Sequence, residues 1–134
     1  MRAVTAILWM SAGATAAYWA IFFTSGAVRV SSEAAYLAFE RAFPAADAWL
    51  AFAAAACALM LARRDPRGLL WGLVAGSSFV YLGLLDVLYD LENNRYASIG
   101  GAMAVEVMIN LFSLSFGPFL IIYLWRHRRW LLRS

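Results

Sequence analysis

Lysine is absent from this sequence, and cysteine and histidine occur once each, as Cys57 and His127. Without lysine, Schiff-base chemistry, a phosphate-loop lysine and a lysine general base are excluded. A lone cysteine cannot form a disulfide within the chain or cycle between thiol and disulfide. A lone histidine cannot supply paired haem ligands or a histidine zinc site. We therefore expect no cofactor and assign no metal ligand, which leaves carboxylates as the reactive groups.

Charged residues are also scarce. They make up 14% of the 134 residues, against 64% hydrophobic residues, and the mean hydropathy is +0.70. A soluble domain of this length needs roughly a quarter of its residues charged to cover one core, so that class is excluded. Four apolar runs reach the length of about 20 residues that a helix needs to cross a bilayer. These runs cover 3–23, 45–62, 68–91 and 102–125.

The sequence therefore predicts an all-α integral membrane protein, a four-transmembrane-helix bundle that forms one domain over residues 1–134. The first run remains apolar through Phe23, beyond the apolar stretch of about 7 to 15 residues in a signal peptide. We interpret it as a retained helix.

Arginines are distributed unevenly between the two sides that these spans define. One side holds three, and the other holds eight, namely Arg2, Arg63, Arg64, Arg67, Arg126, Arg128, Arg129 and Arg133. Because basic residues are retained on the cytoplasmic side, the pattern predicts an inner (plasma) membrane protein with both termini in the cytoplasm. Any homodimer is expected to be parallel. The basic tail 126–134 is expected to bind anionic lipid headgroups, with Trp130, Leu131 and Leu132 in the interface, and not nucleic acid.

The loop between the first and second spans contains a short amphipathic segment. It begins with a helix-start pattern at 31–33 and ends before Pro44. One face is aromatic and the other acidic, with Tyr36, Phe39 and Phe43 opposite Glu33 and Glu40. This pattern predicts an interfacial helix on the outer membrane surface, which either anchors the loop or covers the mouth of a pocket.

Two acids lie inside apolar spans. Asp86 precedes the end of the third span and Glu106 follows the start of the fourth. At about 1.5 Å per residue, both lie roughly 6 to 8 Å below the outer boundary, at matching depth on consecutive helices. A carboxylate there costs at least a few kcal/mol, so both side chains are expected to face the bundle interior. If they adjoin, the pair is expected to share a proton, to hold a cation or to fasten the helices by a hydrogen bond.

Each span also has a stripe of small or polar residues on one face. In chain order the stripes are Ser11, Thr15, Tyr18 and Phe22; Asp47, Leu50, Ala54 and Cys57; Gly72, Gly76, Phe79, Gly83, Asp86 and Asp90; and Glu106, Asn110, Ser113 and Gly117. The stripes predict a cavity open toward the outer side, unless their polar groups only fasten helices to one another. The segment 90–96 is interpreted as an exposed helix end paired with Arg95, or as a site for a hard divalent cation.

The leading hypothesis is a non-enzymatic protein that binds or transports a cationic or amphipathic small molecule. Its more specific version is a proton-coupled carrier. Its ligand-binding residues are expected to be Asp86, Glu106 and Asp90, assisted by Asn110, Tyr81 and Tyr89. Two alternatives stay open. One is a membrane-embedded isomerase or hydrolase that uses Asp86 and Glu106 as acid and base on a lipid. The other is a structural or accessory subunit.

The four-helix plan with acids in an outer-half cavity resembles the emopamil-binding and sterol-isomerase group in architecture. The resemblance implies sterol-type isomerase chemistry for the enzyme alternative. The sequence departs from that group because its one histidine, His127, lies in the tail and not within a span. No motif of the group aligns with this chain residue by residue.

Overall fold

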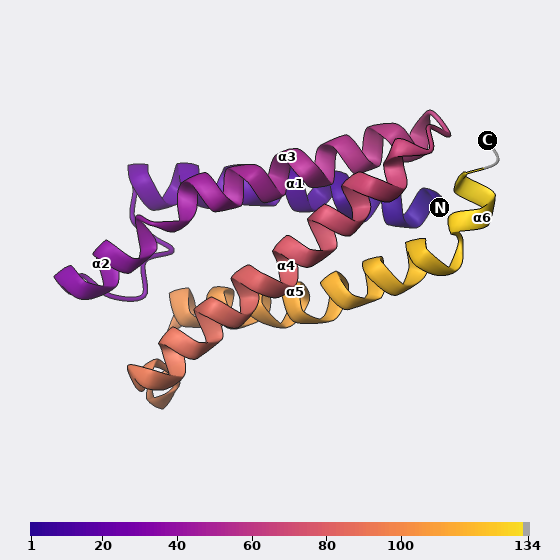
Figure 1. Ribbon diagram of the computed structural model, residues 1–134. Helices are drawn as coiled ribbons and strands as arrows, with labels where there is room; N and C mark the ends of the chain where they lie inside the picture. The colour runs from indigo at the N-terminus through magenta and orange to yellow at the C-terminus, as the bar shows by residue number, and fades with distance from the viewer. Residues whose placement is uncertain (133–134) are drawn as a thin grey trace.

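The computed structural model describes residues 1–132, and within this range the chain is helical, with no strand. The four long helices are α1 (Arg2–Thr24), α3 (Phe43–Ala62), α4 (Arg67–Glu92) and α5 (Gly101–Arg126). Three short helices are α2 (Ala34–Glu40), the 3-10 helix η1 (Arg95–Ala97) and α6 (Arg128–Leu131). Figure 1 shows the long helices running back and forth, with α2 at the end opposite the two termini.

The long helices coincide with the four predicted spans. α1 corresponds to 3–23, α3 to 45–62, α4 to 68–91 and α5 to 102–125, with ends that differ by at most two residues. Each is long and apolar enough to cross a membrane, α3 being taken together with α2. The prediction of an all-helical chain with four helices of membrane-spanning length is confirmed.

The connection from α3 to α4 shows how the local sequence reverses the chain. Arg64 adopts a left-handed backbone conformation with φ of 55°. The Asp65 N–H donates to the Met60 carbonyl oxygen at 2.9 Å, which satisfies a carbonyl at the helix end. Pro66, whose missing N–H costs nothing at a helix start, then leads directly into α4. The short turn makes α3 and α4 antiparallel neighbours.

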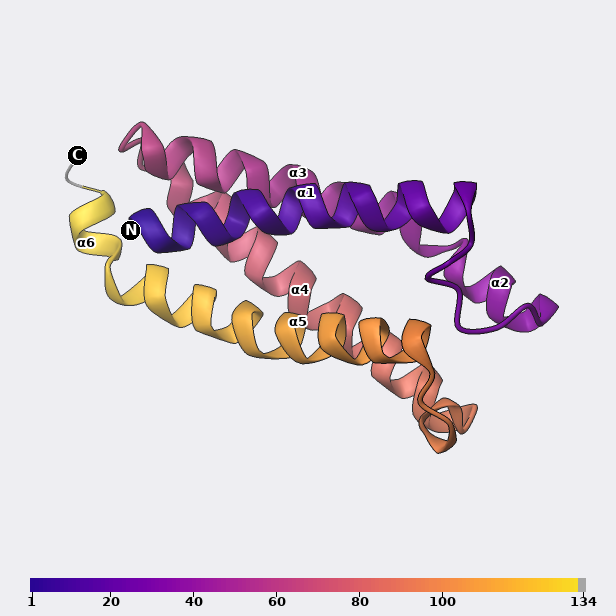
Figure 2. The ribbon, with the colours of Figure 1, turned by 180° about the vertical axis from the view of Figure 1, so that it is seen from behind.

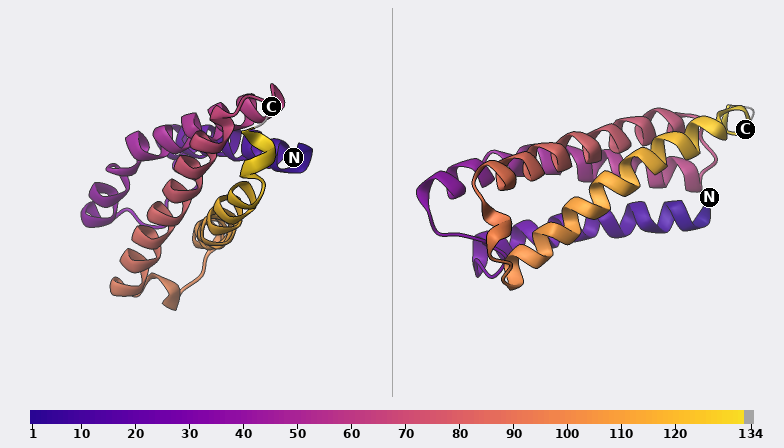
Figure 3. Two further views of the ribbon diagram at one scale, coloured as in Figure 1. Left: turned by 45° about the vertical axis from the view of Figure 1, so that its right-hand side comes forward. Right: turned by 90° about the horizontal axis from the view of Figure 1, so that it is seen from below.

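The helices pack in the order α1, α3, α4, α5, so each long helix contacts the next one in the chain. Figure 2 shows α1 and α5, the two ends of this row, in front of α3 and α4. α1 and α5 approach each other at the end that carries both termini, where the Met1 ammonium group donates to the Tyr123 hydroxyl oxygen at 3.1 Å. Figure 3 shows the termini close together at this end. Much of the core lies here, including Val4, Leu8, Leu61, Leu120, Leu124 and Leu131.

The predicted glycine face of α4 lies against α5. Gly72, Gly76 and Gly83 are buried on α4, and Gly117 is buried on α5. A Cβ atom added at Gly117 would lie 2.8 Å from the Gly76 carbonyl oxygen. Because these backbones touch, the small-residue pattern serves helix packing, as expected.

The tail differs from its prediction at one residue. Leu131 was expected in the membrane interface beside Trp130 and Leu132. The structure instead buries Leu131 in the core, because α6 folds back onto α4 and α5. Trp130 and Leu132 remain exposed.

Large apolar side chains cover much of the outer surface. Leu70 of α4 and Leu111 of α5 have exposed fractions of 60% and 64%. In water such a continuous apolar surface promotes association, whereas in a bilayer it contacts lipid tails. The exterior is therefore compatible with a multi-pass membrane protein.

Candidate functional site

A cavity of about 560 Å³ lies between α1 and α5, in the half of the bundle nearer α2. All four long helices and α2 contribute to its wall. It forms because α1 and α5, which meet at the termini, have no extended contact with each other farther along the described chain. The cavity is thus a consequence of the row-like packing order.

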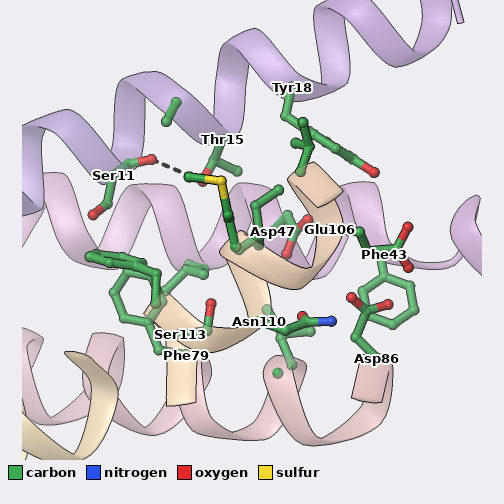
Figure 4. A pocket seen from close by; sticks show the side chains of 18 of the residues that line it. Ser11, Thr15, Tyr18, Phe43, Asp47, Phe79, Asp86, Glu106, Asn110 and Ser113 are labelled. Atoms are coloured by element: carbon green, nitrogen blue, oxygen red, sulfur yellow. Dashed lines mark hydrogen bonds between the residues drawn. The ribbon is translucent and has the colours of Figure 1, made fainter. Parts of the chain in front are cut away.

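The predicted polar stripes converge on this cavity. Its polar lining comprises Ser11, Thr15 and Tyr18 of α1, Asp47 of α3, Asp86 of α4, and Glu106, Asn110 and Ser113 of α5. Figure 4 shows these side chains around one space, with the Asn110 amide directed toward Asp86. The rest of the wall is mostly apolar, with Phe43, Phe79 and Phe112 among the larger groups.

Three carboxylates from three different helices meet at one side of the cavity. Glu40 of α2, Asp86 of α4 and Glu106 of α5 each place an oxygen within 4.8 Å of the other two. Glu40 and Glu106 are 4% and 3% exposed. We call Glu40, Asp86 and Glu106 the carboxylate cluster.

Glu40 was predicted on the face of the interfacial helix opposite Tyr36, and this prediction is wrong because both side chains are buried. Tyr36 lies one turn before Glu40 and is fully buried, and its hydroxyl oxygen accepts a hydrogen bond from the Val30 N–H at 3.1 Å. Phe39 stacks on Tyr89 of α4 with ring centroids 3.8 Å apart. These contacts turn the Tyr36 and Glu40 face of α2 inward, so the segment contributes to the cavity wall.

No arginine or histidine of the described chain lines the cavity. Of the three arginines at this end of the bundle, Arg41 is exposed at the end of α2 and outside the cavity wall, and the other two have other partners. Arg29 donates through Nε to the Phe22 carbonyl oxygen at 2.9 Å, and Arg95 forms an ion pair with Glu33 at 2.8 Å. The carboxylate cluster therefore has no neutralising cation from its own wall.

Asp47, the fourth acid in the wall, does have a donor. The Trp19 indole Nε1–H of α1 donates to Asp47 Oδ2 of α3 at 2.8 Å, so this bond also joins two helices.

We expect Trp19→Phe to lower the free energy of unfolding by about 1–3 kcal/mol, because it removes a hydrogen bond to a charged group and leaves the carboxylate unpaired. Thermal unfolding in detergent measures the loss. Trp9→Phe, on the exposed face of α1, is the control; an equal loss there would show that the bond contributes nothing.

Three predicted site residues lie outside the cavity wall. Tyr81 is 64% exposed on the outer surface, on the far face of α4. Tyr89 is held against Phe39, as described above. Asp90 is fully buried behind the cavity, beside Glu106 and Tyr96. Burial and the nearby Asp90 carboxyl raise the pKa of the Tyr96 phenol to about 12, so this phenol stays protonated next to Asp90.

The segment 90–96 also differs from its prediction. Asp90 is not part of an exposed helix end, because it is buried beside Glu106 of α5 and Tyr96 of η1. Arg95 pairs with Glu33 of the first loop. The exposed Asn93 donates through its amide to the Tyr89 carbonyl oxygen at 2.8 Å. Over residues 1–132, neither the expected pairing with Arg95 nor a convergent set of oxygen ligands forms from this segment.

Comparisons with family models, with curated proteins and with solved structures yield no match to this chain. Its function is therefore inferred from the cavity and its residues.

Proposed function

We propose that this protein spans a membrane with its four long helices and binds a cationic, amphipathic small molecule in the cavity, which it transports in exchange for protons. One observation carries the proposal: the carboxylate cluster lies in a largely apolar cavity whose wall, in the described chain, contains no cationic side chain. Unpaired negative charges are costly in such surroundings, so they need either bound protons or a bound cation.

The rest of the wall suits the body of such a ligand. Phe43, Phe79 and Phe112 offer apolar surface, and Tyr18 and Trp19 offer aromatic faces. Aromatic faces attract organic cations, and apolar pockets with a few convergent polar groups are typical of small-molecule sites. The ligand class is therefore a hydrophobic ammonium or a similar organic cation.

The arginine distribution supports an orientation for this function. At the end where the N-terminus, the α3–α4 turn and the C-terminal tail meet, the described chain carries Arg2, Arg63, Arg64, Arg67, Arg126, Arg128 and Arg129. We place this end in the cytoplasm, with the tail at anionic headgroups, and the carboxylate cluster toward the outer side of the inner membrane. Any self-association is then parallel.

Binding of tetraphenylphosphonium to the purified protein tests the proposal, with tetraphenylborate as an anion of the same shape. We expect saturable binding of the cation alone in equilibrium dialysis. Asp86→Asn should weaken it at least about tenfold, the equivalent of about 1.4 kcal/mol. Glu92→Gln neutralises an exposed acid outside the cavity and should leave the affinity unchanged. Equal binding of both ions, or the same affinity in Asp86→Asn, would contradict the proposal.

A second candidate function is acid–base catalysis on a lipid, by Asp86 and Glu106. It is favoured by the position of the cavity between α1 and α5, where a lipid-soluble substrate has lateral access from the bilayer. Turnover of a lipid extract by the purified protein, abolished by Asp86→Asn and by Glu106→Gln, would support this candidate over binding alone.

A further inference from the structure

We infer that the carboxylate cluster is a binding site for a hard divalent cation of the Ca²⁺ class. Glu40, Asp86 and Glu106 each contribute a carboxylate oxygen, and these three oxygens lie within 4.8 Å of one another. Ca²⁺ binds oxygens at about 2.3–2.6 Å, so opposite ligands of one ion lie about 4.6–5.2 Å apart. The three oxygens can therefore reach a single ion after small side-chain rotations.

The surroundings of Glu106 independently point to a missing positive partner. Both carboxylate oxygens are fully buried, and no amide, hydroxyl or guanidinium donor of the described residues bonds to either. The side chain beside Glu106, that of Asp90, is a further carboxyl group and supplies no positive charge. The side chain is 3% exposed and lines the cavity. Buried carboxylates are normally paired with a cation or coordinate a metal, and residues 1–132 provide no cation here.

The donor set selects the class of ion. All three ligands are carboxylate oxygens, and the cavity wall formed by the described residues contains no histidine or cysteine, so a soft transition metal is disfavoured. The ligands come from α2, α4 and α5, three elements whose spacing is not set by one rigid loop. Ca²⁺ tolerates such flexible geometry, whereas Mg²⁺ demands a near-ideal octahedron. A bound ion would also fasten α2 to α4 and α5.

Tb³⁺ luminescence is the direct test, because Tb³⁺ replaces Ca²⁺ at oxygen sites and is excited by nearby aromatic rings. Tyr18 and Trp19 line the same cavity, so Tb³⁺ bound there should emit on excitation of the protein. We expect Ca²⁺ to quench this emission by competition and to raise the melting temperature of the purified protein.

Substitutions of single acids test whether Tb³⁺ binds at the carboxylate cluster or elsewhere. Glu106→Gln and Glu40→Gln should each weaken Tb³⁺ binding at least about tenfold, since each removes one charged ligand, and should abolish the melting shift by Ca²⁺. Glu92→Gln should change neither. Because Glu40 belongs to a peripheral helix, its variant remains informative if Glu106→Gln fails to fold. Unaltered Tb³⁺ binding in Glu40→Gln, or no melting shift by Ca²⁺ in the wild type, would overturn the inference.

This site does not depend on the organic ligand proposed above. Both occupants supply the positive charge that the cavity wall lacks, so we expect Ca²⁺ and tetraphenylphosphonium to displace each other. Tb³⁺ binding without tetraphenylphosphonium binding would support the metal site and contradict the proposed binding of an organic cation. The reverse result would reject the metal site alone.

Discussion

Gly117→Ala should lower the free energy of unfolding by about 1–3 kcal/mol, and Gly117→Leu should prevent α4 and α5 from packing at all. The added Cβ would lie 2.8 Å from the Gly76 carbonyl oxygen, 2.9 Å from Val80 Cγ2 and 3.0 Å from Phe79 Cβ. The nearest atom belongs to the backbone, so rotating a side chain cannot relieve the clash, and the helices must separate. Chemical unfolding in detergent, followed by circular dichroism, measures the loss.

Gly13→Ala is the matched control. Gly13 also lies within a long helix, α1, but a Cβ atom added there would meet no packed atom of the described chain within 4 Å. Alanine has the higher helix propensity by up to about 1 kcal/mol, so this variant should be neutral or slightly more stable. If Gly13→Ala and Gly117→Ala lost equal stability, the effect would stem from loss of glycine as such and not from close contact between α4 and α5.

The sequence predicted the long helices and the glycine-lined interface well, because both depend on local patterns. An apolar run of sufficient length must form its backbone hydrogen bonds internally, which in a membrane favours a helix. The spacing of Gly72, Gly76 and Gly83 places them on one face of that helix whatever the tertiary structure. The same argument from helix faces predicted that Asp86 and Glu106 point into the bundle, and both line the cavity.

Glu40 and Asp90 were misplaced because their positions depend on tertiary contacts. Separating aromatic from acidic side chains assigned Glu40 to the face of α2 opposite the aromatic residues. The contacts of Tyr36 with Val30 and of Phe39 with Tyr89 select the other orientation. The four-residue spacing of Tyr36 and Glu40 was the available signal that the two share a face. Asp90 lies on the predicted face of α4 but beyond the cavity, a position that depends on how α5 and η1 cover it.

Cation binding should become stronger as pH rises. Protons and a cation compete for the carboxylate cluster, so cation binding releases the protons that otherwise neutralise it. Linkage then requires the affinity to increase by up to about tenfold per pH unit for each proton released. Tetraphenylphosphonium affinity measured by equilibrium dialysis over a series of pH values should rise with pH and then level off where no further protons are released. An affinity that stays constant, or falls as pH rises, would contradict exchange of a cation for protons.

Removing one titrating group identifies where the protons come from. Glu106→Gln should weaken binding and also flatten its pH dependence, because glutamine keeps the shape of the side chain but neither ionises nor releases a proton. Glu92→Gln also removes one carboxylate, on the outer surface at the end of α4, and should leave the slope unchanged. A purely structural role for Glu106 would lower the affinity equally at every pH. The change in slope therefore distinguishes a proton-exchanging carboxylate from one that only fastens helices.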